Sequence, residues 1–336
     1  MKNNFNIIVI CLLISILASC VSDKFDVDVS KINVDLKIKR FDQELFSFNP
    51  DSINKYIPVL QNRYGDFFSL FCNEIINIGG YENKYFPEYL KAFITDVNIK
   101  EIHKQCKNKF KNIDDIENDL TSAFKHYKYY FPQAKTPNVY TYISGFNQSI
   151  VIADNILGIG LDKYMGKSYD YYSKLQLPKY MRIKMNKGMI VPDCMKAWSY
   201  SEFQFKDSAN NLIDNMIYQG KIMYLLDALL PDLPDTMKIG YTEDQLKWCD
   251  KNKKNMWLFL IDHKLLFITN YIEIKKFIDD GPNTSLFTNK SPSRTGIWLG
   301  WQIVKSYMNN NPDVTINQLM NDNDYQGILN KSKFKP

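Results

Sequence analysis

Residues 138–162 constrain the fold most, because they contain the only convincing block of strand sequence in the chain. The runs NVYTYIS (138–144), SIVIAD (149–154) and ILGIGLD (156–162) are short and rich in β-branched and aromatic residues, with turn residues between them. Most of the other segments have helical spacing, and strands do not alternate regularly with helices. The sequence therefore predicts a helix-dominated α+β fold, in which one small β-sheet block (about residues 136–162) packs among many helices.

The clearest amphipathic helix is predicted at residues 114–131. Ile116, Leu120, Phe124 and Tyr127 recur at intervals of four, four and three residues, so their side chains share one face. We expect this face to pack against the core.

Three other segments have readable patterns. Residues 34–41 alternate apolar and polar side chains, which predicts a half-buried strand. Residues 210–231 contain an apolar stripe at helical spacing, and Thr242 stands three residues before Gln245, which is the spacing of a capping box. Both features predict long helices in the second half of the chain.

A helix beginning near Ser293 has an unusual glycine pair. Gly296 and Gly300 are four residues apart and form a smooth stripe, although each glycine costs a helix about 1 kcal/mol relative to alanine. A second backbone packed closely against the stripe would compensate for that cost. Ser293 is the expected N-cap.

Arg294, Trp298 and Trp301 flank the glycine stripe and allow two interpretations. The simpler one is a core helix packed tightly on the domain. The other is a binding groove, in which Arg294 meets an acid and the tryptophan rings contact a ligand. That second interpretation requires exposed rings.

The amino-terminal sequence predicts a lipoprotein signal. Lys2 precedes an apolar run at 7–17, which is too short to cross a bilayer core of about 30 Å. Leu17, Ala18 and Ser19 then lead directly into Cys20, in an order that resembles the bacterial lipobox. We expect cleavage before Cys20 and acylation of its thiol, which would anchor the protein in a membrane.

The predicted organisation follows from this signal. Residues 1–19 are a signal peptide, residues 20–33 a lipidated N-terminus and tether, and residues 34–336 a single globular domain. Val21 does not resemble the aspartate of an inner-membrane retention signal, so the outer membrane is the expected location.

The charge and the cysteine content bear on nucleic-acid binding and on disulfide bonds. The net charge is +5, but the lysines are scattered among asparagines, so no nucleic-acid partner is expected. Beyond the signal, Cys72, Cys106, Cys194 and Cys249 are widely spaced and lack any metal-binding pattern. They are expected to be free buried thiols, and a disulfide among them remains an alternative whose pairing the sequence does not identify.

Residues with obvious chemistry are scarce. The chain has three histidines, no H-E-x-x-H motif and no glycine-rich phosphate loop, so we expect no metal, no cofactor and no catalytic residue. The enzyme alternative is a hydrolase with an unconventional site built from Asp154, Asp162, Asp193 and Arg294, of which Asp154 and Asp162 end two adjacent predicted strands.

Seven segments, in order along the mature chain, carry a family resemblance: IKRFDQELF, FKHYKYYFPQAKTPNVYTYISG, IGLDKYMG, YQGKIMYLLDALLPD, IGYTEDQLKWC, SPSRTGIWLGWQIVKSYM and ILNKSKFKP. Together with the lipobox, they resemble the gliding-motility lipoprotein GldB family of Bacteroidetes. The resemblance implies a cell-envelope lipoprotein associated with the gliding machinery, which is linked to type IX secretion. It implies no catalytic residues, and only Cys20 is carried over, as a modified position.

The order of sheet, helix, YQGK helix and terminal helix is also similar, more distantly, to a family of H-E-x-x-H zinc peptidases. In this chain the corresponding helix, MIVPDCMKAW, has no histidine, and Gln219 stands where an acid would be expected. The similarity implies a degenerate zincin-like metallopeptidase scaffold that has lost its metal.

The leading hypothesis is a non-enzymatic envelope lipoprotein that is held in the membrane by acyl chains on Cys20 and docks protein partners of a gliding or secretion apparatus. The alternatives are the hydrolase described above and a surface lipoprotein that binds a carbohydrate or peptide through Trp298 and Trp301.

Overall fold

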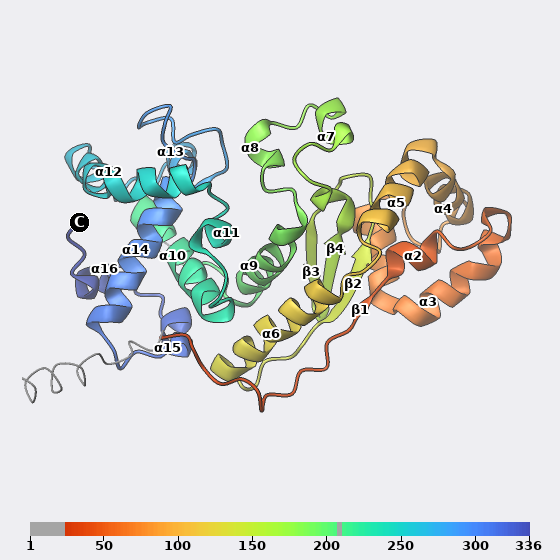
Figure 1. Cartoon of the computed structure of the whole chain (residues 1–336), viewed down its shortest axis with the longest axis horizontal. Coiled ribbons are helices and arrows are strands. Elements are labelled where there is room, and N and C mark those ends of the chain that lie inside the picture. The colour runs from red at the N-terminus through yellow and green to blue at the C-terminus, as the bar shows by residue number, and fades with distance from the viewer. Residues whose placement is uncertain (1–23, 207–209) are drawn as a thin grey trace, which may run out of the picture.

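The computed structural model describes residues 24–206 and 210–336. A small sheet lies between two groups of helices, and a larger helical assembly formed by the C-terminal half extends from one side of it (Figure 1). The predicted helix-dominated α+β class is therefore confirmed. The signal peptide and Cys20 lie outside the described residues.

The sheet has four strands in the order β1-β2-β4-β3. β2 (Asn138–Tyr142) pairs in parallel with both β1 (Ile38–Lys39) and β4 (Ile156–Gly160), while β3 (Ile150–Ala153) pairs with β4 in the antiparallel sense. The three predicted strands of the block thus form as expected. The strand predicted at 34–41 is much shorter than expected, although its alternation of buried and exposed side chains is present.

The two faces of the sheet belong to two separate hydrophobic clusters. Tyr140 and Tyr142 of β2 point into one cluster, and Val139 points into the other, as the two-residue period of a strand requires. Both faces are therefore covered by helices.

The smaller cluster is built from the N-terminal helices. These are α2 (Phe41–Leu45), α3 (Ile53–Leu70), a π-helical turn (Phe71–Ile75) and α4 (Phe86–Thr95). Their aromatic side chains pack edge-to-face around Phe41, whose ring centre lies 5.2 Å from that of Phe67 and 4.8 Å from that of Phe71. This group occupies the right-hand end of the molecule in Figure 1.

The larger cluster begins with α5 (Val97–Lys109), α6 (Asp114–Tyr130) and α9 (Ile190–Glu202). On α6, the four side chains predicted to share one face are all buried, which confirms that helix and its packing face.

Two long helices, α10 (Leu212–Leu229) and α14 (Thr295–Asn310), form the centre of the C-terminal half. They approach so closely that a Cβ atom built on Gly300 would lie 1.7 Å from the carbonyl oxygen of Met216, and one on Gly220 would lie 2.2 Å from the carbonyl oxygen of Gly300. The close backbone packing predicted for the glycine stripe is present. Ser293 is not the N-cap, however, because that position falls on Arg294, whose side chain makes no capping bond.

The remaining helices and turns are distributed over the molecule. They are α7 (Asp170–Lys174), α8 (Lys179–Arg182), α11 (Asp235–Ile239), α12 (Glu243–Asp262), α13 (Tyr271–Ile278), α15 (Ile316–Asn321), α16 (Tyr325–Ser332) and the 3-10 turns Pro50–Ser52, Leu161–Tyr164 and Lys187–Met189. The capping box predicted at Thr242 and Gln245 is present at the start of α12.

Residues 24–33 correct the expectation of a tether. Phe25 and Ile32 pack against the large cluster, and the Phe25 ring meets that of Tyr224 edge-on at 5.3 Å. The Lys24 ammonium also donates a hydrogen bond to the carbonyl oxygen of Met308 at 3.4 Å. This segment therefore lies on the globular body, because the Phe25 ring has a partner on α10 and the Lys24 ammonium has one near the end of α14.

None of the helices within the two described ranges is both long enough and apolar enough to span a bilayer.

Candidate functional site

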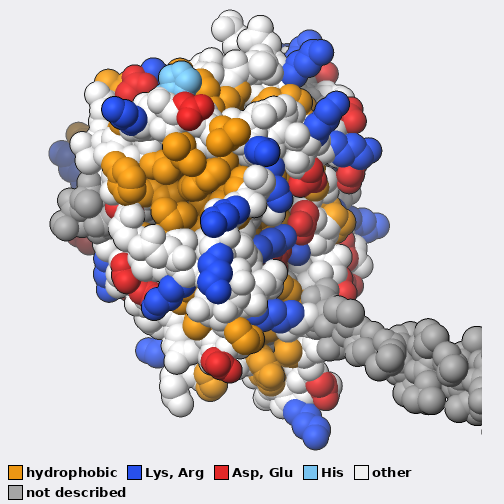
Figure 2. All heavy atoms as spheres, turned by 90° about the vertical axis from the view of Figure 1, so that its left-hand side faces the viewer, with side chains coloured by type: hydrophobic (Ala, Val, Ile, Leu, Met, Phe, Trp, Pro, Cys, Tyr) orange, Lys and Arg blue, Asp and Glu red, His pale blue; other side chains and the backbone are white. Residues whose placement is uncertain are grey.

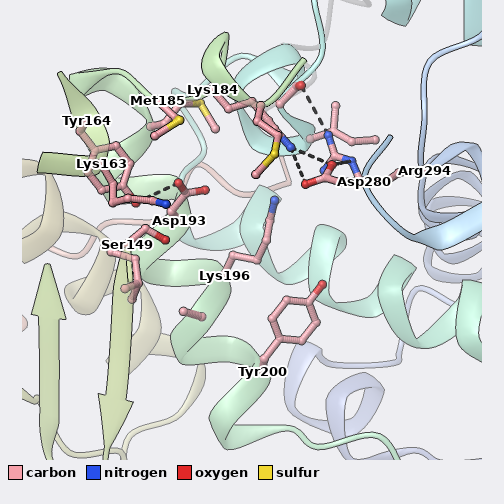
Figure 3. Close-up of a pocket in the computed structure, with 16 residues that line it drawn as sticks. Ser149, Lys163, Tyr164, Lys184, Met185, Asp193, Lys196, Tyr200, Asp280 and Arg294 are labelled. Carbon is pink, nitrogen blue, oxygen red and sulfur yellow. Dashed lines mark hydrogen bonds and ion pairs between the residues drawn. The ribbon is translucent and has the colours of Figure 1, made fainter. Parts of the chain in front are cut away.

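A pocket of about 420 Å³ opens where the sheet block meets the C-terminal helices (Figure 3). This volume lies within the range of small-molecule sites in proteins. Its walls come from the start of β3, the Leu161–Tyr164 turn, α8 and the segment after it, one face of α9, the end of α11, and Asp280 and Arg294. Segments far apart in the sequence thus build one cavity.

Asp280 joins two cations at the rim of the pocket. Its carboxylate lies 2.7 Å from the Lys184 ammonium and 2.8 Å from Nε of Arg294. Burial alone would raise the pKa of Asp280, but the charges of Arg294 and Lys184 outweigh that effect and hold its pKa below the usual range. Arg294 is the residue before α14 and has a left-handed backbone, with φ of 59°.

Lys196 extends from α9 into the middle of the pocket (Figure 3). Its ammonium donates a hydrogen bond of 3.1 Å to the carbonyl oxygen of Lys238, and it forms no ion pair within the described ranges. Burial, followed by repulsion from Arg294 and Lys184, lowers the pKa of Lys196 to about 8, and Asp193 and Asp280 only partly oppose this. An amine that titrates near neutral pH is therefore held inside a cavity.

Lys163 and Asp193 occupy the side of the pocket nearest the sheet (Figure 3). The Lys163 ammonium donates a hydrogen bond to the carbonyl oxygen of Phe146 at 3.2 Å, and burial lowers its pKa. The Asp193 carboxylate accepts a hydrogen bond of 3.0 Å from the Tyr164 hydroxyl, and burial raises its pKa.

Positive charge exceeds negative charge in this pocket. Four cationic side chains line it, against the carboxylates of Asp193 and Asp280. Lys184 and Arg294 share Asp280, so Lys196 and Lys163 have only backbone carbonyls as close polar partners among the described residues. Charge that is partly removed from water without a counter-ion is unfavourable, so the cavity is suited to an anionic group.

The four residues proposed for a hydrolase do not form one site. Asp193 and Arg294 line the pocket, but Asp154 lies in the turn between β3 and β4 and borders a separate depression. Asp162 is fully buried, and its carboxylate accepts backbone N–H bonds from Ser144 at 3.1 Å and Phe146 at 2.7 Å, which is a structural role. The expected convergence of these acids is wrong. No group of three or more His, Cys, Asp or Glu side chains within residues 24–206 and 210–336 could hold a metal ion.

The second interpretation of the glycine-stripe helix, a binding groove with exposed tryptophan rings, is also wrong. Trp298 and Trp301 are 1% and 0% exposed, and Nε1 of Trp301 donates a hydrogen bond of 2.8 Å to the Asp227 carboxylate. Neither ring is at the surface, because both pack inside the C-terminal core. Of the three groove residues, only Arg294 reaches the pocket.

Sequence reasoning missed the lysines of the pocket and Asp280. A signal for part of the site was present, because Asp193, Lys196 and Tyr200 recur at three and four residues along α9 and share one face of an otherwise largely buried helix. The hydroxyl of Tyr200 also donates a hydrogen bond to the side-chain oxygen of Gln219 on α10.

All four cysteines within the described ranges are free and buried. Burial raises the pKa of each thiol, so none has the character of a nucleophile.

A family model described as gliding motility protein GldB matches residues 22–336. Comparison with curated proteins and with solved structures found no match. The family match covers the sheet, both hydrophobic clusters and the whole pocket, and so the chain belongs to the GldB family of gliding motility proteins.

Proposed function

We propose that this protein is a lipid-anchored, non-enzymatic docking component of the gliding machinery, and that its cationic pocket binds an acidic group of a partner. The observation that carries the proposal is the excess of cations in a pocket where, among residues 24–206 and 210–336, no carboxylate lies within ion-pair distance of Lys196. Family membership supports the link to gliding motility and to lipoproteins. Anchoring would come from acyl chains on Cys20, with Leu17, Ala18 and Ser19 forming the cleavage motif.

Several finer points belong to the same proposal. They are the outer membrane as the location, a connection to type IX secretion, and a body that works as one domain from residue 34 to residue 336. Two clusters that share one small sheet support the single domain, because the strands supply side chains to both.

We also propose that the pocket descends from a zincin-like metallopeptidase cleft. In support, α9 lines the cavity and α10 follows it along the chain, as in the resembling peptidases, and a hydrogen bond between Tyr200 and Gln219 joins these two helices. In this chain a lysine amine, and not a set of metal ligands, occupies the centre of the cleft.

Binding of small acids by the full-length protein tests the pocket. The probes are N-acetyl-leucine and its uncharged amide, which differ only in the carboxylate. The three methionines Met181, Met185 and Met189 give the cavity an apolar wall for the leucine side chain. We expect the acid to bind at least tenfold more tightly than the amide, because a charge-assisted hydrogen bond contributes about 1.5–3 kcal/mol.

Lys196→Met should abolish that preference, whereas Lys247→Met, at an exposed site on α12 outside the pocket, should leave it unchanged. The preference should also decline as pH rises through about 8, where the Lys196 amine loses its proton. Asp193, Asp280, Arg294 and Lys184 also face this amine. Equal binding of acid and amide by the unmodified protein would refute the proposed pocket function.

The hydrolase alternative has its own readout. Turnover of a peptide library that is lost in Asp193→Asn, with the fold intact by circular dichroism, would replace docking with catalysis.

Co-purification from membranes in a larger assembly is expected for a docking component, and a monodisperse protein without partners would count against that role.

A further inference from the structure

An exposed apolar area covers the end of the molecule formed by α12, α13 and the loop between them (Figure 2). We name it the α12–α13 patch, and it consists of Leu258, Ile261, Phe267, Tyr271 and Ile272. Their exposed fractions run from 42% for Leu258 to 70% for Ile272. Contiguous apolar surface of this kind usually marks an interaction site.

The patch has a fixed shape. The loop between α12 and α13 is held to the start of α10, because the backbone N–H groups of Leu212 and Ile213 donate to the carbonyl oxygens of Ile268 at 3.0 Å and Leu266 at 2.9 Å. The backbone of the loop is therefore held in place, and binding would not require it to become ordered.

Lysines accompany the patch. Lys251, Lys254 and Lys264 are exposed on α12 or just after it. The C-terminal segment adds Lys333 and Lys335, since Phe334 between them packs edge-on against Trp257 of α12 at 5.3 Å. Figure 2 shows Lys and Arg side chains beside the apolar area, with some Asp and Glu side chains among them. Apolar side chains with basic neighbours suit a surface of anionic lipid.

The described chain begins on this side of the molecule. Lys24 is bonded to Met308 at the end of α14, and Figure 1 places this point on the same side as α12, α13 and α16. Only four Cα steps separate Lys24 from Cys20, which is at most about 15 Å at 3.8 Å per step. Because residues 24–33 are packed on the body, they cannot extend this reach.

We propose that the face carrying the α12–α13 patch rests on the surface of the membrane in which the protein is anchored. This inference rests on the lipid anchoring at Cys20 in the proposed function. The short link brings the face to the bilayer, the apolar side chains enter the interface, and the lysines meet anionic headgroups.

The test uses the full-length lipoprotein in vesicles of phosphatidylethanolamine and phosphatidylglycerol that contain a nitroxide-labelled lipid. A fluorescent label is attached at Phe267→Cys in the patch or at Tyr89→Cys on α4, an exposed site at the opposite end of the molecule. The described native cysteines are buried and should not compete for the label. We expect the nitroxide to lower the fluorescence at position 267 at least twofold and to leave position 89 unchanged.

A charge variant isolates the contribution of the patch. With the label at position 267, the double substitution Leu258→Glu and Ile272→Glu should abolish quenching while the protein still floats with the vesicles. The matched control, Tyr81→Glu with Tyr85→Glu near α4, places the same charge on exposed aromatic positions and should have no effect.

The outcomes separate this inference from the proposed function. A protein that does not float with vesicles lacks the lipid anchor, which refutes the anchoring on which both depend. A protein that floats, but whose label at 267 is quenched no more than the label at 89, keeps its anchor and overturns the membrane-facing patch. Such a patch would be free for a protein partner.

Discussion

Replacing Gly300 by alanine should test the close packing of α10 against α14. A Cβ atom at this position would lie 1.7 Å from the carbonyl oxygen of Met216, whereas an ordinary contact is 3.4 Å or more. The two helix backbones would have to separate by more than about 1.5 Å, and overpacking of this kind costs about 1–3 kcal/mol or more. The better helix propensity of alanine returns about 1 kcal/mol. Because a backbone atom is the obstacle and cannot rotate away, the upper end of that range applies, and we expect a net loss of about 2 kcal/mol.

Urea denaturation followed by circular dichroism should detect this loss. In thermal unfolding, an entropy near 2.1 cal/mol/K per residue over a body of about 310 residues converts this loss to a fall of about 3 °C in melting temperature. Gly281→Ala is the matched control, because its new Cβ would meet nothing closer than 3.5 Å, and its stability should change by less than about 0.5 kcal/mol. Gly220→Ala should resemble Gly300→Ala, and the double variant should cost less than the sum. A Gly300→Ala protein as stable as the control would refute the close packing of α10 and α14.

Four further predictions concern buried groups and the N-terminal segment. Burial lowers the pKa of Lys221 to about 8 in the folded protein. Between pH 8 and about 10.5 the unfolded chain therefore binds more protons than the folded one, and the free energy of unfolding should rise with pH by up to about 3 kcal/mol. Urea titrations at several pH values should show this rise, and Lys221→Met should flatten it. Asp227→Ala removes the acceptor of the Trp301 indole N–H and the nearer of the two carboxylates of the Lys238 ammonium, which then keeps only Asp235 at 3.5 Å. This change should cost about 3 kcal/mol by the same method, and a much smaller loss would argue against the buried network. Mass spectrometry after alkylation should find the four described cysteines unmodified in the native protein and all modified in denaturant. Phe25→Ala should release residues 24–33, speed their proteolysis and weaken quenching at the α12–α13 patch, and unchanged protease resistance would contradict the packed segment.

The contrast between α6 and α10 explains which parts of the fold could be predicted. On α6 one face is buried and the other is solvated, so the spacing of Ile116, Leu120, Phe124 and Tyr127 was sufficient. Helix α10 is buried almost all round, and it carries Lys221 and Asp227 inward, where ion pairs and backbone carbonyls satisfy them. Such polar residues resemble a solvated face in the sequence, and only tertiary partners distinguish the two cases.

The pocket was less predictable than the fold, because its charged groups come from distant segments. Asp193 and Lys196 share a helix face and could have been paired from their spacing. Asp280 and Arg294 follow α13 and precede α14, and their meeting with Lys184 depends on how these loops pack. Asp162 was assigned wrongly in the opposite sense. It was proposed as a catalytic acid because it ends a strand, but its carboxylate accepts hydrogen bonds from two backbone N–H groups.

The packed segment at residues 24–33 determines how this protein would meet its partners. With three residues between Cys20 and Lys24, where the packed segment begins, an anchored molecule could not move through a large volume and would search only a thin layer beside the lipid. Confinement of two molecules to one layer raises their effective concentration, which can reach the millimolar range for short links. A weak interaction at the pocket would then suffice for stable assembly in the membrane and would fail once either molecule leaves it.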